Sequence, residues 1–273
     1  MKTNYLKFWG VRGSRSTAES NKLKYGGDTS CVEIRTKDND LIILDMGTGL
    51  SKLGETILSD STYPRNINIF LSHYHWDHLL GFLNFTPLFD KSFSITIYGN
   101  NKSTSIDKIS EKILDKAFWP VSLDMLKAKI NFVELGNEPV IINNSIINFK
   151  DHSHPNGATS YKVTIDNFSI LYSTDSEHPN DKLNENVLKM AKNTDILIHD
   201  SHFTEEDLKD HIGWGHSSWR QAVNVAIKSG AKKLFLFHYS PEYNDDIIDS
   251  IEQKAQGLLE TCEASKQNLK VNF

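Results

Sequence analysis

The chain has 273 residues, of which 38% are hydrophobic and 24% charged, and its formal net charge is −5. This composition supports a sizeable core and excludes a disordered chain. No apolar run reaches the ~18 residues of a membrane-spanning helix, and the first residues lack the apolar stretch of a signal peptide, so we expect a cytoplasmic protein. Because an acidic surface repels polyanions unless a local basic patch exists, we expect a small-molecule substrate and no long nucleic acid or membrane partner.

The two cysteines, Cys31 and Cys262, are far apart in the sequence and form no CxxC pair. This spacing argues against a thiolate zinc site and against a disulfide framework. We therefore predict two structural thiols. No linker rich in proline, glycine or serine divides the chain, and we expect one domain over residues 1–273.

Predicted strands occupy most of the chain and are separated by glycine-containing loops. They are Tyr5–Trp9, Cys31–Ile34, Leu41–Asp45, Ile67–Leu71, Phe93–Tyr98, Ile141–Phe149, Thr159–Ile165, Ser169–Ser173, Ile196–His199 and Ala231–His238. The clearest helix is Ser217–Ser229, which has one apolar stripe, a serine at its start and Gly230 after its end. Long runs of strands with interspersed helices predict an α/β (α+β) fold class, as a β-sandwich flanked by helices.

The segment His73-Tyr74-His75-Trp76-Asp77-His78 contains three imidazoles and one carboxylate, and it directly follows a predicted strand. In an extended backbone, His73 and His75 point to the same side, so both can bind one ion. Asp77 and His78 can bind a second ion. Imidazole and carboxylate ligands suit zinc, manganese or iron. The segment therefore indicates a binuclear metal centre rather than a surface run of histidines.

Three later residues at strand ends or in loops complete the candidate ligand set. They are His154 before Pro155, Asp175 after the strand Ser169–Ser173, and His238 after the last apolar strand. Asp175 has two carboxylate oxygens and can bridge two ions. Two ions about 3.5–4 Å apart polarise a phosphoryl or acyl oxygen and hold a hydroxide nucleophile.

The HxHxDH pattern of His73–His78, together with Leu44–Gly49, resembles the metallo-β-lactamase superfamily from about Phe8 to Tyr243. Within it, the chain is similar to the phosphodiesterase branch that includes tRNase Z and the cyclic-phosphate phosphodiesterases. The resemblance implies a single αββα sandwich domain and two divalent ions, Zn²⁺ first and Mn²⁺ as the alternative. It also implies that Asp45 supports the site. The implied metal ligands are His73, His75, Asp77, His78, His154, Asp175 and His238.

His216 lies just before the predicted helix, where free N–H groups and the helix dipole favour an anion. In tRNase Z, which this stretch resembles, a histidine at this place contacts the scissile phosphate. We therefore assign His216 as a general acid or a phosphate-binding residue. The acidic partner that the family carries in the helix is not expected here, because Ser217, Ser218, Trp219 and Arg220 follow.

Asp77 and His216 form the predicted catalytic set. Trp214 and Ser217 are the neighbours of His216, and with it they are predicted to bind substrate. His199 ends a predicted strand and is interpreted as a residue that supports the metal ligands from behind.

Other polar residues have different expected roles. His154 is preferred to His152 as a ligand, because the family match falls on the His-Pro pair. His178 and His211 are expected to be exposed loop histidines. Arg12 lies in a glycine-flanked loop, where it meets either a phosphate or a surface carboxylate.

Only 20 residues separate His154 from Asp175, so the tRNA-gripping arm that tRNase Z enzymes insert there does not fit. The segments Phe8–Ser14, Tyr25–Cys31 and Gly213–Ser217 look like a bacterial and phage group that includes cyclic-nucleotide phosphodiesterases, among them the anti-Pycsar enzymes. This resemblance implies a homodimer that hydrolyses 3′,5′-cyclic nucleotides to nucleoside monophosphates through a metal-bridging hydroxide. Evasion of cyclic-nucleotide (Pycsar) immunity is one implied role. The alternatives are a phosphoribosyl cyclic phosphate phosphodiesterase, an RNase or a lactonase on the same fold.

Overall fold

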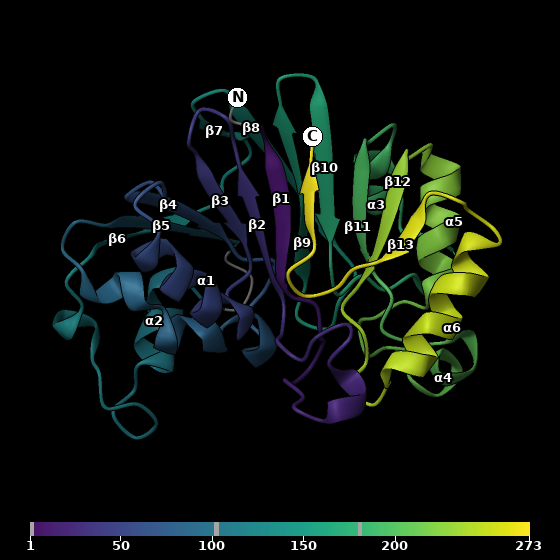
Figure 1. The fold of residues 1–273 in the computed structure, drawn as a ribbon, viewed down its shortest axis with the longest axis horizontal. Coiled ribbons are helices and arrows are strands. Elements are labelled where there is room, and N and C mark those ends of the chain that lie inside the picture. The colour runs from purple at the N-terminus through teal and green to yellow at the C-terminus, as the bar shows by residue number, and fades with distance from the viewer. Residues whose placement is uncertain (1–2, 101–103, 180–181) are drawn as a thin grey trace. The chain divides into compact units, whose positions relative to one another are not determined.

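Two seven-stranded sheets run through the described part of the chain, which is residues 3–100, 104–179 and 182–273 of a computed structural model. The contacts between residues divide the chain into two units, and each unit contains one of the sheets. The first unit is Met1–Gly10, Asp28–Asn137 and Gln267–Phe273, and the second unit is Val11–Gly27 and Glu138–Lys266. Figure 1 labels most of the strands and the helices of both units.

The first unit's sheet has the strand order β14-β1-β2-β3-β4-β5-β6. Its strands are β1 (Tyr5–Gly10), β2 (Cys31–Arg35), β3 (Leu41–Leu44), β4 (Asn66–Phe70), β5 (Ser94–Gly99), β6 (Lys129–Glu134) and β14 (Lys270–Asn272). The strands from β3 to β6 are parallel, and Leu44 pairs with Phe70 at the ends of β3 and β4. Because parallel strands end at the same edge, the residues that follow β3 and β4 leave the sheet side by side.

The helices of the first unit are α1 (Gly49–Ser59) and α2 (Ile106–Ile113), with short 3-10 turns at Trp76–His78, Leu80–Asn84, Thr86–Phe89 and Leu123–Met125. Along α1, the buried residues Leu50, Leu53 and Ile57 recur at helical spacing. They join a core with residues of the sheet, such as Ile69. Both helices are additional to the one predicted from the sequence.

The second unit's sheet has the strand order β13-β12-β11-β10-β9-β8-β7. Its strands are β7 (Val140–Ile142), β8 (Ser145–His152), β9 (Ala158–Ile165), β10 (Phe168–Ser173), β11 (Ile196–Asp200), β12 (Lys233–Phe237) and β13 (Cys262–Ala264). The single strand predicted over Ile141–Phe149 is wrong, because β7 and β8 form a hairpin. Asn143 adopts a left-handed backbone with φ of 48° at its turn.

The helices of the second unit are α3 (Glu185–Ala191), α4 (Glu205–Asp210), α5 (Trp219–Ser229) and α6 (Asp245–Gln256), with a 3-10 turn at Ser20–Lys22. The predicted helix over Ser217–Ser229 is α5, which begins two residues later. Ser218 is its N-cap and forms a capping box with Gln221. Gly230 ends α5 as predicted, with a left-handed φ of 71°.

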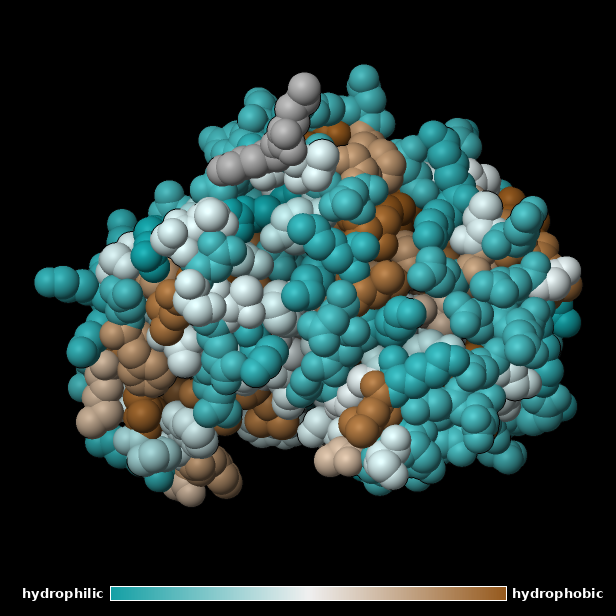
Figure 2. Space-filling view, viewed as in Figure 1, coloured by the Kyte–Doolittle hydropathy of each residue, from teal (hydrophilic) through white to brown (hydrophobic). Residues whose placement is uncertain are grey.

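Each unit thus combines one sheet with its own helices, and the predicted mixed α/β class is confirmed. Both cysteines are free and buried, as predicted. The face drawn in Figure 2 is mostly hydrophilic, with smaller hydrophobic areas. Among the described residues, no helix combines the length and the apolar character needed to span a bilayer.

Candidate metal centre

Three of the predicted site residues lie just beyond strand ends and share an unusual backbone. Asp45 follows β3 with φ of 64°, Asp175 lies two residues beyond β10 with φ of 51°, and His238 follows β12 with φ of 66°. Left-handed backbone at residues other than glycine is energetically unfavourable and tends to occur at functional sites. The three positions therefore share a backbone conformation that is typical of functional sites.

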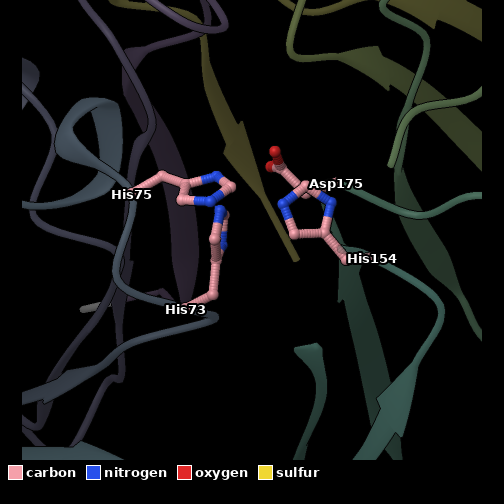
Figure 3. A group of neighbouring side chains, drawn as sticks. All are labelled: His73, His75, His154 and Asp175. Carbon is pink, nitrogen blue, oxygen red and sulfur yellow. The ribbon is translucent and has the colours of Figure 1, made fainter. Parts of the chain in front are cut away.

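In the first unit, the predicted ligands come from the segment that follows β4. His73 and His75 project from this segment with their rings adjacent, the ring centroids being 4.5 Å apart (Figure 3). The His73 and His78 rings are 4.2 Å apart, and Nε2 of His78 lies 3.3 Å from Oδ2 of Asp77. The structure thus brings all four predicted ligands of the first unit together.

Asp45 hydrogen-bonds the segment that carries the predicted ligands. Its Oδ2 is 2.8 Å from Nδ1 of His78 and accepts a hydrogen bond from the Ser72 hydroxyl at 2.8 Å. Its Oδ1 accepts from the Ser72 amide at 2.7 Å. With Nδ1–H of His78 directed at this buried carboxylate, Nε2 remains as the ligand atom, which is the usual carboxylate–histidine–metal arrangement.

Glycines allow the loop after β3 to approach the histidine segment closely. A Cβ at Gly47 would lie 2.4 Å from the Asp77 carbonyl oxygen, and a Cβ at Gly81 would lie 1.9 Å from the Gly47 carbonyl oxygen. The Met46 amide donates to the His78 carbonyl at 2.9 Å. These contacts hold the segment His73–His78 in its observed conformation.

The predicted ligands of the second unit are His154, Asp175 and His238, of which Figure 3 draws the first two. Nδ1 of His154 lies 3.0 Å from the Gly215 carbonyl oxygen and donates to it, which leaves Nε2 as the ligand atom. Gly215 has φ of 89°, and a Cβ there would lie 2.0 Å from Nδ1 of His154. Oδ2 of Asp175 lies 3.3 Å from Nε2 of His238.

The donor atoms present fit a divalent metal ion. Two ligands of one tetrahedral zinc ion, with bonds of about 2.0–2.2 Å, are separated by roughly 3.4 Å. The pairs His78–Asp77 and His238–Asp175 are each separated by 3.3 Å. Nitrogen and carboxylate oxygen donors suit zinc and also accept manganese.

His216 has an acidic partner that the sequence analysis did not find. Its Nδ1 lies 3.0 Å from Oδ2 of Asp200, the last residue of β11. The following helix carries no acidic residue, as expected, and the carboxylate comes instead from a strand 16 residues earlier. Asp175 is close as well, with its Oδ1 at 3.7 Å from Nδ1 of His216.

Electrostatics keep Asp200 ionised. Burial by itself would raise the pKa of Asp200, but the charges and hydrogen bonds of His216 and His238 outweigh burial and hold the pKa well below its usual range. The neighbouring His202 is uncharged instead, because burial and the nearby His216 and His238 hold its pKa well below 6.5. His202 is therefore neutral, and its ring stacks on His216 at 4.2 Å.

The other residues predicted near His216 lie in different environments. Trp214 is 61% exposed, and its ring packs edge-on against His211. Ser217 is fully buried; its hydroxyl donates to the Ser176 carbonyl at 2.5 Å and its amide to Oδ1 of Asp200 at 2.8 Å. These bonds indicate that Ser217 positions Asp200 rather than contacting substrate.

His199 is also buried, and it hydrogen-bonds the Asp200 carbonyl at 2.8 Å and stacks on His178. Among the described residues of the second unit, the structure records no ring contact and no hydrogen bond between His199 and a predicted metal ligand. In the run His199–His202, Asp200 is the residue that contacts the ligand set.

Arg12 does not serve either role expected for it, because it is fully buried. Its guanidinium donates to the carbonyl oxygens of Gly26 at 2.9 Å and Tyr243 at 2.8 Å, with longer bonds to those of Ser240 and Lys22. A buried guanidinium with four carbonyl acceptors holds backbone segments together and is not exposed to a phosphate.

Gly13, next to Arg12, lies against the site. A Cβ at Gly13 would lie 2.6 Å from Cε1 and Nδ1 of His238 and 2.7 Å from Nδ1 of His202. The Gly13 amide donates to the Tyr239 carbonyl at 2.9 Å. The glycine therefore lets the N-terminal loop form one wall of the His238 site.

His178 is buried, against the expectation of an exposed loop histidine. Its Nδ1 accepts the Asn184 amide at 3.0 Å, which fixes the neutral tautomer. Burial, with repulsion from His199 and His152, lowers the pKa of His178 from 6.5 to about 3. Burial likewise lowers the pKa of His152 to about 4.

Known families and proteins resemble this chain over most of its length. The model described as "Beta-lactamase superfamily domain" matches residues 41–239. The chain is 26% identical over 280 residues to ribonuclease Z of Picrophilus torridus, covering 86% of this chain and 87% of that relative. It is 25% identical over 251 residues to ribonuclease Z of Bacillus velezensis, covering 75% and 80%.

Solved structures share the fold. The metallo-β-lactamase fold protein YhfI from Bacillus subtilis matches with a TM-score of 0.75 at 18% identity over all of both chains. A diphosphatase of the PhnP family matches with a TM-score of 0.72 at 17% identity, over 100% of this chain and 98% of that chain. The short form of human tRNase Z matches with a TM-score of 0.68 at 15% identity over 98% of both chains. The predicted metallo-β-lactamase fold is thereby confirmed.

Replacing Asp45 by asparagine tests its support of the metal ligands. The asparagine side chain would keep the size and tolerate the left-handed backbone, but it would lose the charge that orients His78. We expect zinc affinity, measured by competition with a chelator, to fall about 10- to 100-fold. Asp40→Asn, which alters a carboxylate hydrogen-bonded to Thr36 in the same unit, should bind zinc as the wild type does. Equal affinities of all three proteins would contradict the assignment.

Gly13→Ala should disturb His238 through the short Cβ contacts. Overpacking of about 1–3 kcal/mol corresponds to roughly tenfold weaker metal binding. Metal content after dialysis, measured by elemental analysis, is the readout. The control is Gly136→Ala, where nothing lies within 4 Å of the new Cβ. Wild-type metal content in Gly13→Ala would show that the loop does not form this wall.

The depressed pKa of His178 predicts an acid-sensitive stability. The unfolded chain protonates this histidine below pH 6.5, whereas the folded protein does so only near pH 3, so stability falls as pH decreases through this window. His178 should contribute about 2 kcal/mol of the loss in unfolding free energy between pH 7.5 and 5. His178→Asn should flatten the pH dependence by this amount, and His211→Asn should not. If the unfolding free energies of His178→Asn and the wild type changed with pH in parallel, this role of His178 would be refuted.

Proposed function

Because the chain belongs to the beta-lactamase superfamily, we propose that it is a metal-dependent phosphodiesterase that hydrolyses 3′,5′-cyclic nucleotides to nucleoside monophosphates. The observation that carries this proposal is the pairing of His216 with the ionised Asp200 at 3.0 Å, with Asp175 3.7 Å away on the same ring nitrogen. A histidine held by a buried carboxylate is suited to protonate the oxygen that leaves phosphorus.

The proposal places two divalent ions, zinc first and manganese as the alternative, at the predicted ligands. These ligands are His73, His75, Asp77 and His78 of the first unit and His154, Asp175 and His238 of the second. When bound, such ions supply positive charge that polarises a phosphoryl oxygen and activates water for attack. Asp45 and the Gly215 carbonyl then orient His78 and His154 for binding.

His216 is the proposed general acid. Asp200 accepts Nδ1–H and stabilises the protonated imidazolium, so Nε2–H is available for the leaving ribose oxygen. Asp200 keeps its charge across the physiological range because its pKa lies well below the usual value. Neutral His202, stacked on His216, adds no competing charge.

The substrate size follows from the interval between His154 and Asp175. The structure describes this whole interval, and β9, β10 and the turn at Asp166–Asn167 occupy most of it. Within this fully described interval there is no inserted arm to grip a folded RNA. This feature and the net charge of −5 support a small substrate. The homodimer implied by the resemblance stays a prediction, to be measured by light scattering.

RNA cleavage is the second candidate function. It is favoured by the relatives named ribonuclease Z, which align with most of this chain. The same metal ligands and the His216–Asp200 pair would serve an RNA phosphodiester equally well. A lactonase would need no acid–base pair of this kind, since its reacting group is a carbonyl.

The decisive experiment compares four 3′,5′-cyclic nucleotides, a precursor tRNA, a lactone and bis(p-nitrophenyl) phosphate, with zinc or manganese supplied. Turnover of a cyclic nucleotide is expected. His216→Ala and Asp200→Asn should lower it about 10²- to 10⁴-fold. They should affect bis(p-nitrophenyl) phosphate much less, because its leaving group needs no proton. Asp195→Asn, a carboxylate in the same unit that pairs with Lys232, is the control.

Each outcome of this panel has a distinct meaning. Preferential cleavage of precursor tRNA would replace the first candidate by the second. Lactone turnover without phosphodiester turnover would refute both. A preference for cyclic pyrimidine nucleotides would support a role in evading cyclic-nucleotide immunity, and a preference for cyclic purine nucleotides would support signalling.

A further inference from the structure

A groove of about 630 Å³ lies beside His216, entirely within the second unit. Residues of α5 line one side, and residues of α4 and the loop that follows it line the other. None of the metal ligands predicted for the second unit lines it. Its volume falls within the ~300–1,000 Å³ typical of small-molecule sites.

The position of His216 connects this groove to the ligand set. His216 is 9% exposed and lines the groove, while its ring lies 5.8 Å from the ring of His154 and 5.2 Å from that of His238. A substrate with its phosphate at His216 therefore has the rest of the molecule available to enter the groove.

The α5 side of the groove is polar. Gln221, Asn224 and Lys228 recur at i, i+3 and i+7, so they share one face of the helix. The Gln221 side chain accepts a hydrogen bond from the Ser218 amide in the capping box, whereas the Asn224 side chain is exposed. An amide offers both a donor and an acceptor, as the edge of a nucleobase does.

The opposite side supplies apolar surface. Leu208 of α4 lines the groove, and Ile212 lines it while being 75% exposed. Apolar side chains such as these can pack against the face of a base. Three cationic residues and two carboxylates also line the groove, so it attracts anions although the whole chain is negative. The cations are Lys209, Arg220 and Lys228.

We propose that this groove binds the nucleoside part of the substrate, with Ile212 against the face of the base and Asn224 hydrogen-bonded to its edge. The proposal rests on the proposed function for the position of the phosphate, but the groove itself is independent of it. Asn224 is thus a specificity-determining residue. It lies five residues beyond the start of α5, roughly 7.5 Å along the helix axis, so it is beyond the reach of the reacting phosphate.

The test is equilibrium binding of nucleoside 5′-monophosphates and of ribose 5-phosphate to the metal-loaded protein. Asn224→Ala should weaken nucleoside monophosphate binding about tenfold, the value of one hydrogen bond. Ile212→Ser should weaken it similarly. Neither variant should change the binding of ribose 5-phosphate, which has no base. The matched control is Asn148→Ala, which removes an exposed asparagine on β8 of the same unit.

The outcomes separate this proposal from the proposed function. Unchanged nucleotide binding in both variants, or equal losses for nucleotides and ribose 5-phosphate, would overturn the groove assignment. Selective loss of nucleotide binding supports it even if no phosphodiester is hydrolysed, in which case only the proposed function fails. Both variants are at exposed positions, and circular dichroism verifies that they fold.

Discussion

The carboxylate of Asp200 accepts hydrogen bonds from several loops that carry site residues. Its Oδ2 accepts from the amide of Asp175 and the ring of His216, and its Oδ1 from the amides of Ser217 and His202. A buried carboxylate is costly to desolvate and is retained only when such donors satisfy it. The carboxylate at the end of β11 therefore positions the loop after β10, the loop before α5 and His216, the proposed general acid.

The first unit uses the same device at the end of β3. Asp45 is buried, has a left-handed backbone and accepts from Ser72 and His78. In both units an aspartate at the end of a strand receives Nδ1 of a histidine and leaves Nε2 for chemistry. The histidine is a predicted metal ligand in one unit and the proposed acid in the other. This orientation makes the imidazole a directional group rather than a mobile one.

The local motifs of this chain were predictable from the sequence, and the pairings between distant segments were not. The segment His73–His78 has its chemistry in six consecutive residues, so a pattern identifies it. Asp200 contacts His216 from a distant strand. In the segment His199–His202, a role was predicted for His199 and none for Asp200. The only available indication was that an acidic residue ends an apolar strand, as Asp45 also does.

The predictions for Arg12 and His178 were wrong because both side chains are buried. Arg12 is charged and lies in a glycine-flanked segment, which is typical of a surface loop. Its guanidinium is nevertheless buried, because four backbone carbonyl oxygens accept its hydrogen bonds. His178 was likewise expected at the surface. Most strand positions were predicted within one or two residues, because alternation and apolar runs are local. The hairpin of β7 and β8 was missed because its turn consists of two asparagines within an otherwise apolar stretch.

The left-handed backbone at Asp45, Asp175 and His238 limits how the metal preference of this fold can be engineered. A softer ion such as Cu(I) calls for thiolate ligands. Placing cysteine at residue 238 would leave a non-glycine side chain in a conformation that costs roughly 1–2 kcal/mol, without the wide ring that now packs against Gly13. Residue 75 is the better position, because its backbone is extended with φ of −72°. Exchange of predicted ligands should therefore begin at residue 75, where the backbone conformation does not restrict the choice of residue.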